Sequence, residues 1–183
     1  LWNFNRISYI SDLHLMHRIK NAGCKSKEDV VFTIKKIIDD ILAESTSLTL
    51  IGGDVSSEFS IFELFVKMLR KLAGSGRRTF VFVLGNHELW NFPGLSVDEI
   101  VDQYRTVLKE NGMYLLHNDL FYRNESDDMG IIPYDELIQS DNPAILEKLR
   151  CTRLVILGGL GFSGYNEEFN ANDGVYRATV DRN

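Results

Sequence analysis

Carboxylate, amide and imidazole side chains gather in three short segments of the chain, and each segment follows an apolar run. The segments are Ser11-Asp12-Leu13-His14, Gly52-Gly53-Asp54 and Gly85-Asn86-His87-Glu88. Because residues i and i+2 of an extended chain point the same way, Asp12 and His14 can reach one metal ion together. Asn86 adds a neutral carbonyl oxygen for a metal and an NH₂ group for a phosphate, and His87 can donate a proton. The segments therefore indicate a metal-dependent site for a phosphorylated ligand.

Each segment alone has an ordinary structural explanation. An Asp two residues before a His is also typical of a solvated turn, and Gly-Gly-Asp is a common turn because glycine lets the backbone bend sharply. Asn86 is compatible with an Asx turn beside a solvated His87. The combination favours function, because three such segments follow three strand-like runs and are separated by helix-length stretches.

The elements that must position these side chains alternate along the chain. β-branched, aromatic and aliphatic runs predict strands at 7–10, 48–51, 79–84, 114–116, 120–123 and 154–157. Helical periodicity and capping residues predict helices at 26–42, 57–72, 96–110 and 142–150. This order predicts an α/β fold, a layered β-sheet core flanked by helices, with ligands at the carboxyl ends of the strands.

Composition limits the class of protein. The 183 residues carry 20 Lys and Arg against 26 Asp and Glu, a net charge of −6, which disfavours a large nucleic-acid footprint without excluding one. No apolar run approaches the ~18–20 residues needed to cross a bilayer, so we expect no membrane partner. The only cysteines, Cys24 and Cys151, lie far apart, which favours reduced thiols and a cytoplasmic location.

The order D-x-H, G-D and G-N-H-E resembles the core of the calcineurin-like metallophosphoesterase superfamily, and the resemblance spans 7–88. It implies that Asp12 and His14 bind a first metal, that Asp54 bridges two metals, and that Asn86 binds the second metal and the phosphate. His87 would contact the phosphate and assist the leaving group. The implied function is hydrolysis of phosphate mono- or diesters by a bridging hydroxide on two divalent ions. Carboxylate, amide and imidazole ligands suit Mn²⁺, Fe or Zn²⁺.

The sequence departs from the family pattern after the third segment. The family has a later His and a G-H-x-H motif, whereas this chain has only His14, His17, His87 and His117. We expect His17 and His117 at the surface or in turns. We expect residues 1–183 to form one domain that is the N-terminal part of a longer phosphoesterase, with an incomplete second sheet. The alternative is a non-catalytic interaction module with a degenerate metal site.

Two further segments are candidates for contact with substrate. Trp90, Asn91 and Phe92 follow the third segment and could form an aromatic wall for the leaving group, and core packing is an equal alternative. The glycine-rich stretch 158–166 predicts a loop at the rim of the site, with Tyr165 and Asn166 as substrate contacts.

Overall fold

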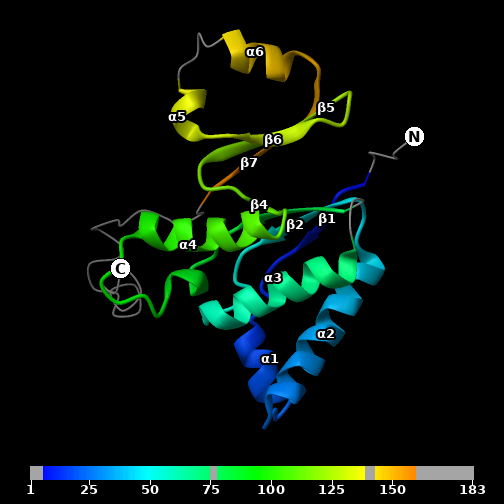
Figure 1. Ribbon diagram of the computed structural model, residues 1–183, viewed down its shortest axis with the longest axis vertical. Coiled ribbons are helices and arrows are strands. Elements are labelled where there is room, and N and C mark those ends of the chain that lie inside the picture. The colour runs from blue at the N-terminus through cyan, green and yellow to red at the C-terminus, as the bar shows by residue number, and fades with distance from the viewer. Residues whose placement is uncertain (1–5, 75–77, 139–142, 160–183) are drawn as a thin grey trace, which may run out of the picture.

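The computed structural model describes residues 6–74, 78–138 and 143–159 (Figure 1). The proposed substrate contacts Tyr165 and Asn166, and the predicted helix start at Asn142, lie outside the described residues.

The sheet that carries the three polar segments is parallel. Within the described residues its strands are β1 (Ser8–Ile10), β2 (Leu48–Gly52), β3 (Thr79–Val83) and β4 (Tyr114–Leu115), in the spatial order β1-β2-β3-β4. Every pairing is parallel, with Ile10 opposite Ile51 and Ile51 opposite Phe82. The carboxyl ends of β1, β2 and β3 therefore lie side by side at one edge of the sheet.

Helices cover one face of this sheet. They are α1 (Leu15–Asn21), α2 (Lys27–Glu44), α3 (Phe59–Ala73) and α4 (Val97–Glu110). Two begin with capping boxes, in which the Ser26 hydroxyl accepts from the Asp29 N–H and the Ser96 hydroxyl accepts from the Glu99 N–H. These bonds satisfy backbone donors that the first helical turn leaves without partners, so the sequence fixes where both helices begin.

The core between these helices and the sheet is rich in aromatic side chains. Phe62 is fully buried and packs edge-to-face against Phe82 of β3 and Tyr104 of α4. Edge-to-face contact places the positive edge of one ring on the negative face of the next. The cluster therefore locks two helices onto the strand that leads into the third polar segment.

A second sheet packs on the opposite face of the first. Its described strands are antiparallel and lie in the order β6-β5-β7: β5 (Asp119–Asn124), β6 (Met129–Ile132) and β7 (Thr152–Gly158). Val81 and Phe121 are among the buried residues of the inter-sheet cluster, with Ile156 packed against it. The short helices α5 (Tyr134–Leu137) and α6 (Pro143–Arg150) cover the outer face of this sheet, so Figure 1 shows four layers.

The architecture confirms the predicted α/β class, with a parallel sheet flanked by helices, and each predicted strand and helix has a counterpart. The elements α1, β6 and α5 were not predicted, because each is seven residues or shorter and has little periodicity to detect. The expectation that residues 1–183 form one domain, the N-terminal part of a longer protein, stays a prediction.

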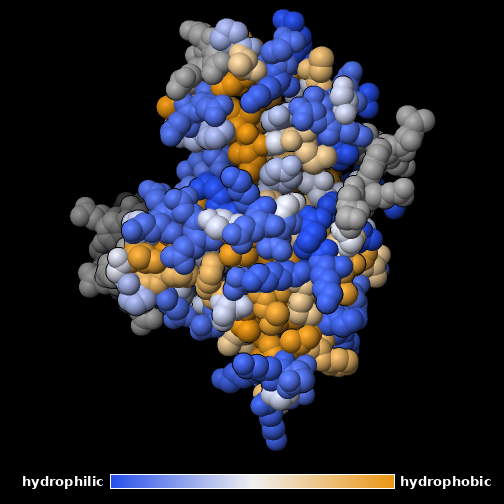
Figure 2. Space-filling view, in the orientation of Figure 1, coloured by the Kyte–Doolittle hydropathy of each residue, from blue (hydrophilic) through white to orange (hydrophobic). Residues whose placement is uncertain are grey.

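Hydrophilic side chains dominate the face in Figure 2, with hydrophobic residues gathered over the region of α2 and α3 and beside the second sheet. None of the helices in the described ranges is long and apolar enough to span a bilayer.

Truncation of Phe62 tests the aromatic core. We expect Phe62→Ala to lower the free energy of unfolding by about 3–5 kcal/mol, because it removes a fully buried ring and leaves a cavity. The matched control is Phe32→Ala, since Phe32 is 71% exposed and its loss should change stability by about 0.5 kcal/mol or less. Urea unfolding of both variants measures the difference, and equal losses would contradict this packing.

Candidate metal centre

The first two polar segments are joined by backbone hydrogen bonds that extend the β1–β2 pairing beyond the strands. The Asp12 N–H donates to the Gly53 carbonyl at 3.1 Å, and the His14 N–H donates to the Asp54 carbonyl at 2.8 Å. Leu15 continues the pattern by donating to Val55 at 2.8 Å. The loops after β1 and β2 therefore run alongside one another, and their side chains meet.

The buried carboxylate of Glu88 joins the second segment to the third. It accepts from the backbone N–H groups of Asp54 at 2.9 Å, Ser56 at 3.0 Å and Gly85 at 2.7 Å. Glu88 has no exposed surface. Burial raises the pKa of the Glu88 carboxyl, while the three N–H donors oppose that rise by stabilising the charged form. One side chain thus fixes both loops that carry Asp54 and Asn86.

Glycine is required where these two loops touch. A Cβ on Gly53 would lie 2.5 Å from the backbone N of Gly85, and a Cβ on Gly85 would overlap the Asp54 carboxylate. Gly53 also has a φ of +87°, in the left-handed region that glycine tolerates best. Side chains at either position would separate the two loops.

Three candidate ligands have unusual backbone conformations. Asp12, His14 and Asp54 have positive φ values of 56°, 44° and 54°. Left-handed conformations cost non-glycine residues about 1–3 kcal/mol each and are concentrated at functional sites. Backbone hydrogen bonds between the loops hold these residues there, and the side chains of His14 and Asp54 meet in one cluster.

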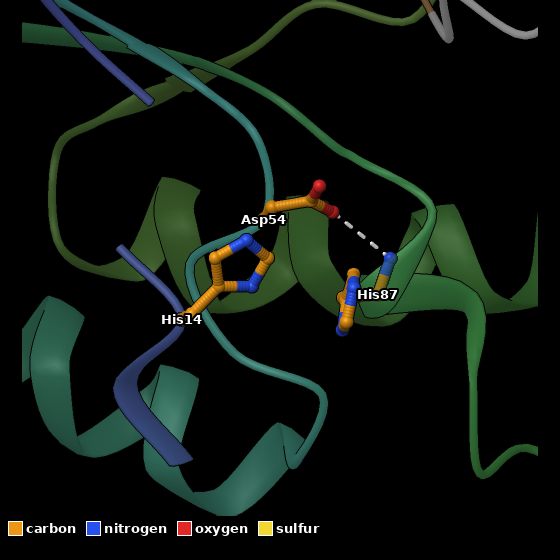
Figure 3. A group of neighbouring side chains, drawn as sticks. All are labelled: His14, Asp54 and His87. Atoms are coloured by element: carbon orange, nitrogen blue, oxygen red, sulfur yellow. Dashed lines mark hydrogen bonds between the residues drawn. The ribbon is translucent and has the colours of Figure 1, made fainter. Parts of the chain in front are cut away.

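The result is a compact cluster of His14, Asp54 and His87 (Figure 3). One ligand atom from each residue lies within 4.8 Å of the other two. The imidazoles of His14 and His87 meet edge-to-face with ring centroids 4.7 Å apart, and the backbone N–H of His87 donates to Asp54 Oδ1 at 3.0 Å. Two imidazoles and a carboxylate at this spacing fit a divalent cation such as Mn²⁺, Fe²⁺ or Zn²⁺.

Asp12 lies at the rim of the cluster. Its Oδ1 is 3.6 Å from His14 Nε2, and its side chain is 63% exposed. It is close enough to His14 for the two residues to share a cation, as the D-x-H spacing predicts. Its metal-binding role stays a prediction.

Asn86 lies directly against Asp54. With its NH₂ group turned toward the carboxylate, the Asn86 amide donates to both oxygens of Asp54 at 3.2 Å. This contact places Asn86 beside the cluster. Its metal-binding role, which the family resemblance implies, stays a prediction.

His87 belongs to the third polar segment and, like His14, is half-buried. Burial is the main cause that lowers the pKa of His87, and the neighbouring His14 lowers it further, while the carboxylates of Asp54 and Asp12 oppose the shift. The neutral form is favoured, and neutral imidazole is the form that binds a metal. The structure groups His87 with two predicted metal ligands, whereas the sequence predicted a contact with phosphate.

The aromatic residues after the third segment have two different surroundings. The Trp90 indole stacks on the His87 ring with centroids 3.9 Å apart, whereas Phe92 packs against Phe59 and Tyr104 in the core. Core packing therefore applies to Phe92, while an aromatic wall for the leaving group stays a prediction. Neither the contact of Trp90 with His87 nor the role of Glu88 was predicted, and the Glu in G-N-H-E was the available signal for the latter.

The two other histidines lie outside the cluster. His17 is exposed on α1, as expected. His117 is in a bend after β4 and lines a cavity of about 1010 Å³ between α4 and the second sheet. Its Nδ1 is buried and has no hydrogen-bond partner among the described residues. None of the cluster residues His14, Asp54 and His87 lines this cavity.

Glu88→Gln tests the carboxylate that joins the loops. The amide keeps the size of the side chain but has only one acceptor oxygen, so its NH₂ group faces a backbone N–H. We expect a loss of about 1–3 kcal/mol in the free energy of unfolding, together with weaker Zn²⁺ binding. Glu110→Gln, at the exposed end of α4, is the matched control for loss of charge and should change neither property. Urea unfolding and calorimetric titration with Zn²⁺ measure both, and unchanged Zn²⁺ binding in Glu88→Gln would contradict the role.

Titration of His87 tests the electrostatics of the cluster. In the metal-free chain we expect its imidazole to titrate at a lower pH when folded than when unfolded in urea, because burial disfavours the charged form. The lowered pKa contributes stability above the ordinary pKa of histidine, and that contribution is lost as the pH falls through the folded value. NMR of the imidazole protons, with and without urea, follows both states. A higher midpoint in the folded chain would show that Asp54 and Asp12 outweigh burial.

The chain matches the model of the calcineurin-like phosphoesterase family over residues 6–178, which include both sheets and the whole cluster. No curated protein and no solved structure matches the chain. The family model covers most of the sequence, and the fold and the cluster agree with the motifs that the sequence shares with the family. The chain belongs to the calcineurin-like phosphoesterase family, whose members hydrolyse phosphoesters with divalent metals.

Proposed function

We propose that this chain hydrolyses phosphate mono- or diesters at a site for two divalent ions. The observation that carries the proposal is the convergence of His14, Asp54 and His87 at the carboxyl ends of three parallel strands, with ligand atoms within 4.8 Å of one another. Membership of the phosphoesterase family supports the reaction class.

The ligands divide into two sets that share one carboxylate. Asp12 and His14 come from the loop after β1 and would hold the first ion. Asn86, from the loop after β3, would hold the second. Asp54 lies between these loops and contacts both, since its backbone binds His14 and its carboxylate faces Asn86. A central carboxylate with two oxygens is suited to bridge the ions.

The metals would activate water near neutral pH and neutralise the charge that develops on the phosphate. The chain's own residues would orient the ester. The amide of Asn86 would contact a phosphate oxygen, and the neutral imidazole of His87 would donate a hydrogen bond to the phosphate or the leaving oxygen. Burial lowers the pKa of His87, which keeps the neutral form available at pH 7.

We further propose manganese as a physiological metal, since oxygen and imidazole ligands without thiolate suit it. The proposed partner is a phosphorylated substrate.

A cytoplasmic location is supported by the small number of cysteines, because Cys24 and Cys151 are both free thiols within the described structure.

Asp54→Asn and His87→Ala test this function. With Mn²⁺ and bis(p-nitrophenyl) phosphate, we expect Asp54→Asn to abolish hydrolysis through loss of the shared ligand. We expect His87→Ala to lower kcat by about 10²–10⁴-fold through loss of a hydrogen bond to the reacting group. EDTA should abolish wild-type activity.

The control variant is His117→Ala, because His117 is a half-buried histidine outside the cluster. It should retain the wild-type rate. Wild-type rates in Asp54→Asn would refute the proposed site. If the wild-type chain binds Mn²⁺ but hydrolyses neither a mono- nor a diester, the result would instead support the non-catalytic interaction module.

A further inference from the structure

Trp90 contacts the one cluster residue that has a proposed role toward the substrate. Its indole stacks on the His87 imidazole with ring centroids 3.9 Å apart and planes inclined by 36°. The His87 ring also meets His14 edge-to-face, with ring centroids 4.7 Å apart. The imidazole of His87 therefore contacts both an indole and a second imidazole.

The backbone holds Trp90 in this position from both sides. The 3-10 helix η1 (His87–Leu89) ends at Trp90, whose N–H donates to the His87 carbonyl at 3.3 Å. The next residue, Asn91, has a φ of +65° and donates from Nδ2 to the Ser57 carbonyl at 3.1 Å and to Glu58 Oε1 at 3.2 Å. The indole is thus placed by fixed backbone on each side, although it is itself partly exposed.

The contact restricts the His87 side chain. A histidine ring on a surface loop samples several χ1 and χ2 values, and a catalytic group that is misplaced by about 1 Å can lose about 10²-fold in rate. Stacking by Trp90 removes the orientations in which the ring swings away from Asp54. It also covers one face of the imidazole from water. Both effects keep the ring at the cluster before any ligand binds.

We propose that Trp90 is a positioning residue for His87 and holds its imidazole against the metal cluster in the orientation needed for contact with the phosphate. This inference rests on the proposed function of the site. It assigns Trp90 no contact with the reacting atoms.

Paired substitutions test the effect on turnover. We expect Trp90→Ala to lower kcat for bis(p-nitrophenyl) phosphate by about 10–100-fold with little change in KM, because the ester still binds the metals while His87 is misplaced. Trp90→Phe retains a ring that can stack and should recover most of the lost kcat. A wild-type kcat in Trp90→Ala, or the same loss of kcat in both variants, would overturn the proposal.

Fluorescence gives a readout that needs no activity. The sequence contains two tryptophans, Trp2 and Trp90, so Trp2→Phe leaves Trp90 as the single indole. We expect Zn²⁺ to change its emission with saturation, because a cation on the cluster changes the charge beside the imidazole that the indole touches. Adding Asp54→Asn should abolish that change at the same Zn²⁺ concentrations.

The two readouts separate failure of this inference from failure of the proposed function. If the wild-type chain binds Zn²⁺ in calorimetry but the emission of Trp90 does not respond, the coupling between Trp90 and His87 is refuted, whatever the activity. If the emission responds and Asp54→Asn abolishes the response, the coupling holds even where wild-type hydrolysis is absent, and only the proposed function fails.

Discussion

The buried carboxylate of Glu88 is the interaction on which the candidate site depends. Its three N–H donors come from the loops after β2 and β3, so it fixes the separation of Asp54 from Asn86 and His87. A buried charge is costly unless hydrogen bonds compensate it, and here three backbone dipoles do so. The Tyr104 hydroxyl also donates to the Glu88 backbone carbonyl, which connects these loops to the aromatic core.

This arrangement explains how the loops can hold unfavourable backbone conformations. Positive φ at Asp12, His14 and Asp54 costs free energy on folding. Hydrogen bonds to neighbouring loops keep the backbone of these residues from returning to an unstrained conformation. The close approach of Gly53 to Gly85 lets those loops lie near enough for one carboxylate to reach both. Stability of the core and geometry of the site are therefore linked, because a core that released α4 would also release Tyr104 and the loop that it holds.

The sequence predicted the fold well because its signals are local. Capping boxes at Ser26 and Ser96 and the apolar run 79–84 are readable without tertiary contacts, and the parallel order of strands then brings the three polar segments together. The left-handed backbone at Asp12 and the stacking of Trp90 on His87 depend on contacts between segments distant along the chain or on exact side-chain placement. The periodicity of a sequence contains no information about such contacts. The sequence therefore predicted that His14, Asp54 and His87 lie at one edge of the sheet, but it could not give the distances between them.

The position of His87 shows why motif roles and geometry must be considered together. The family resemblance implies a phosphate contact, whereas the structure places His87 beside His14 and Asp54 at a spacing typical of a metal ligand. Metal binding requires the neutral ring and a hydrogen bond to phosphate is compatible with it, and burial favours that form by lowering the pKa of His87. They differ in where the ring points, since a ligand must face the cation and a phosphate contact must face the ester beyond it. Because His14 and Trp90 both contact the ring, the orientation of His87 depends on its neighbours as well as on the motif that contains it.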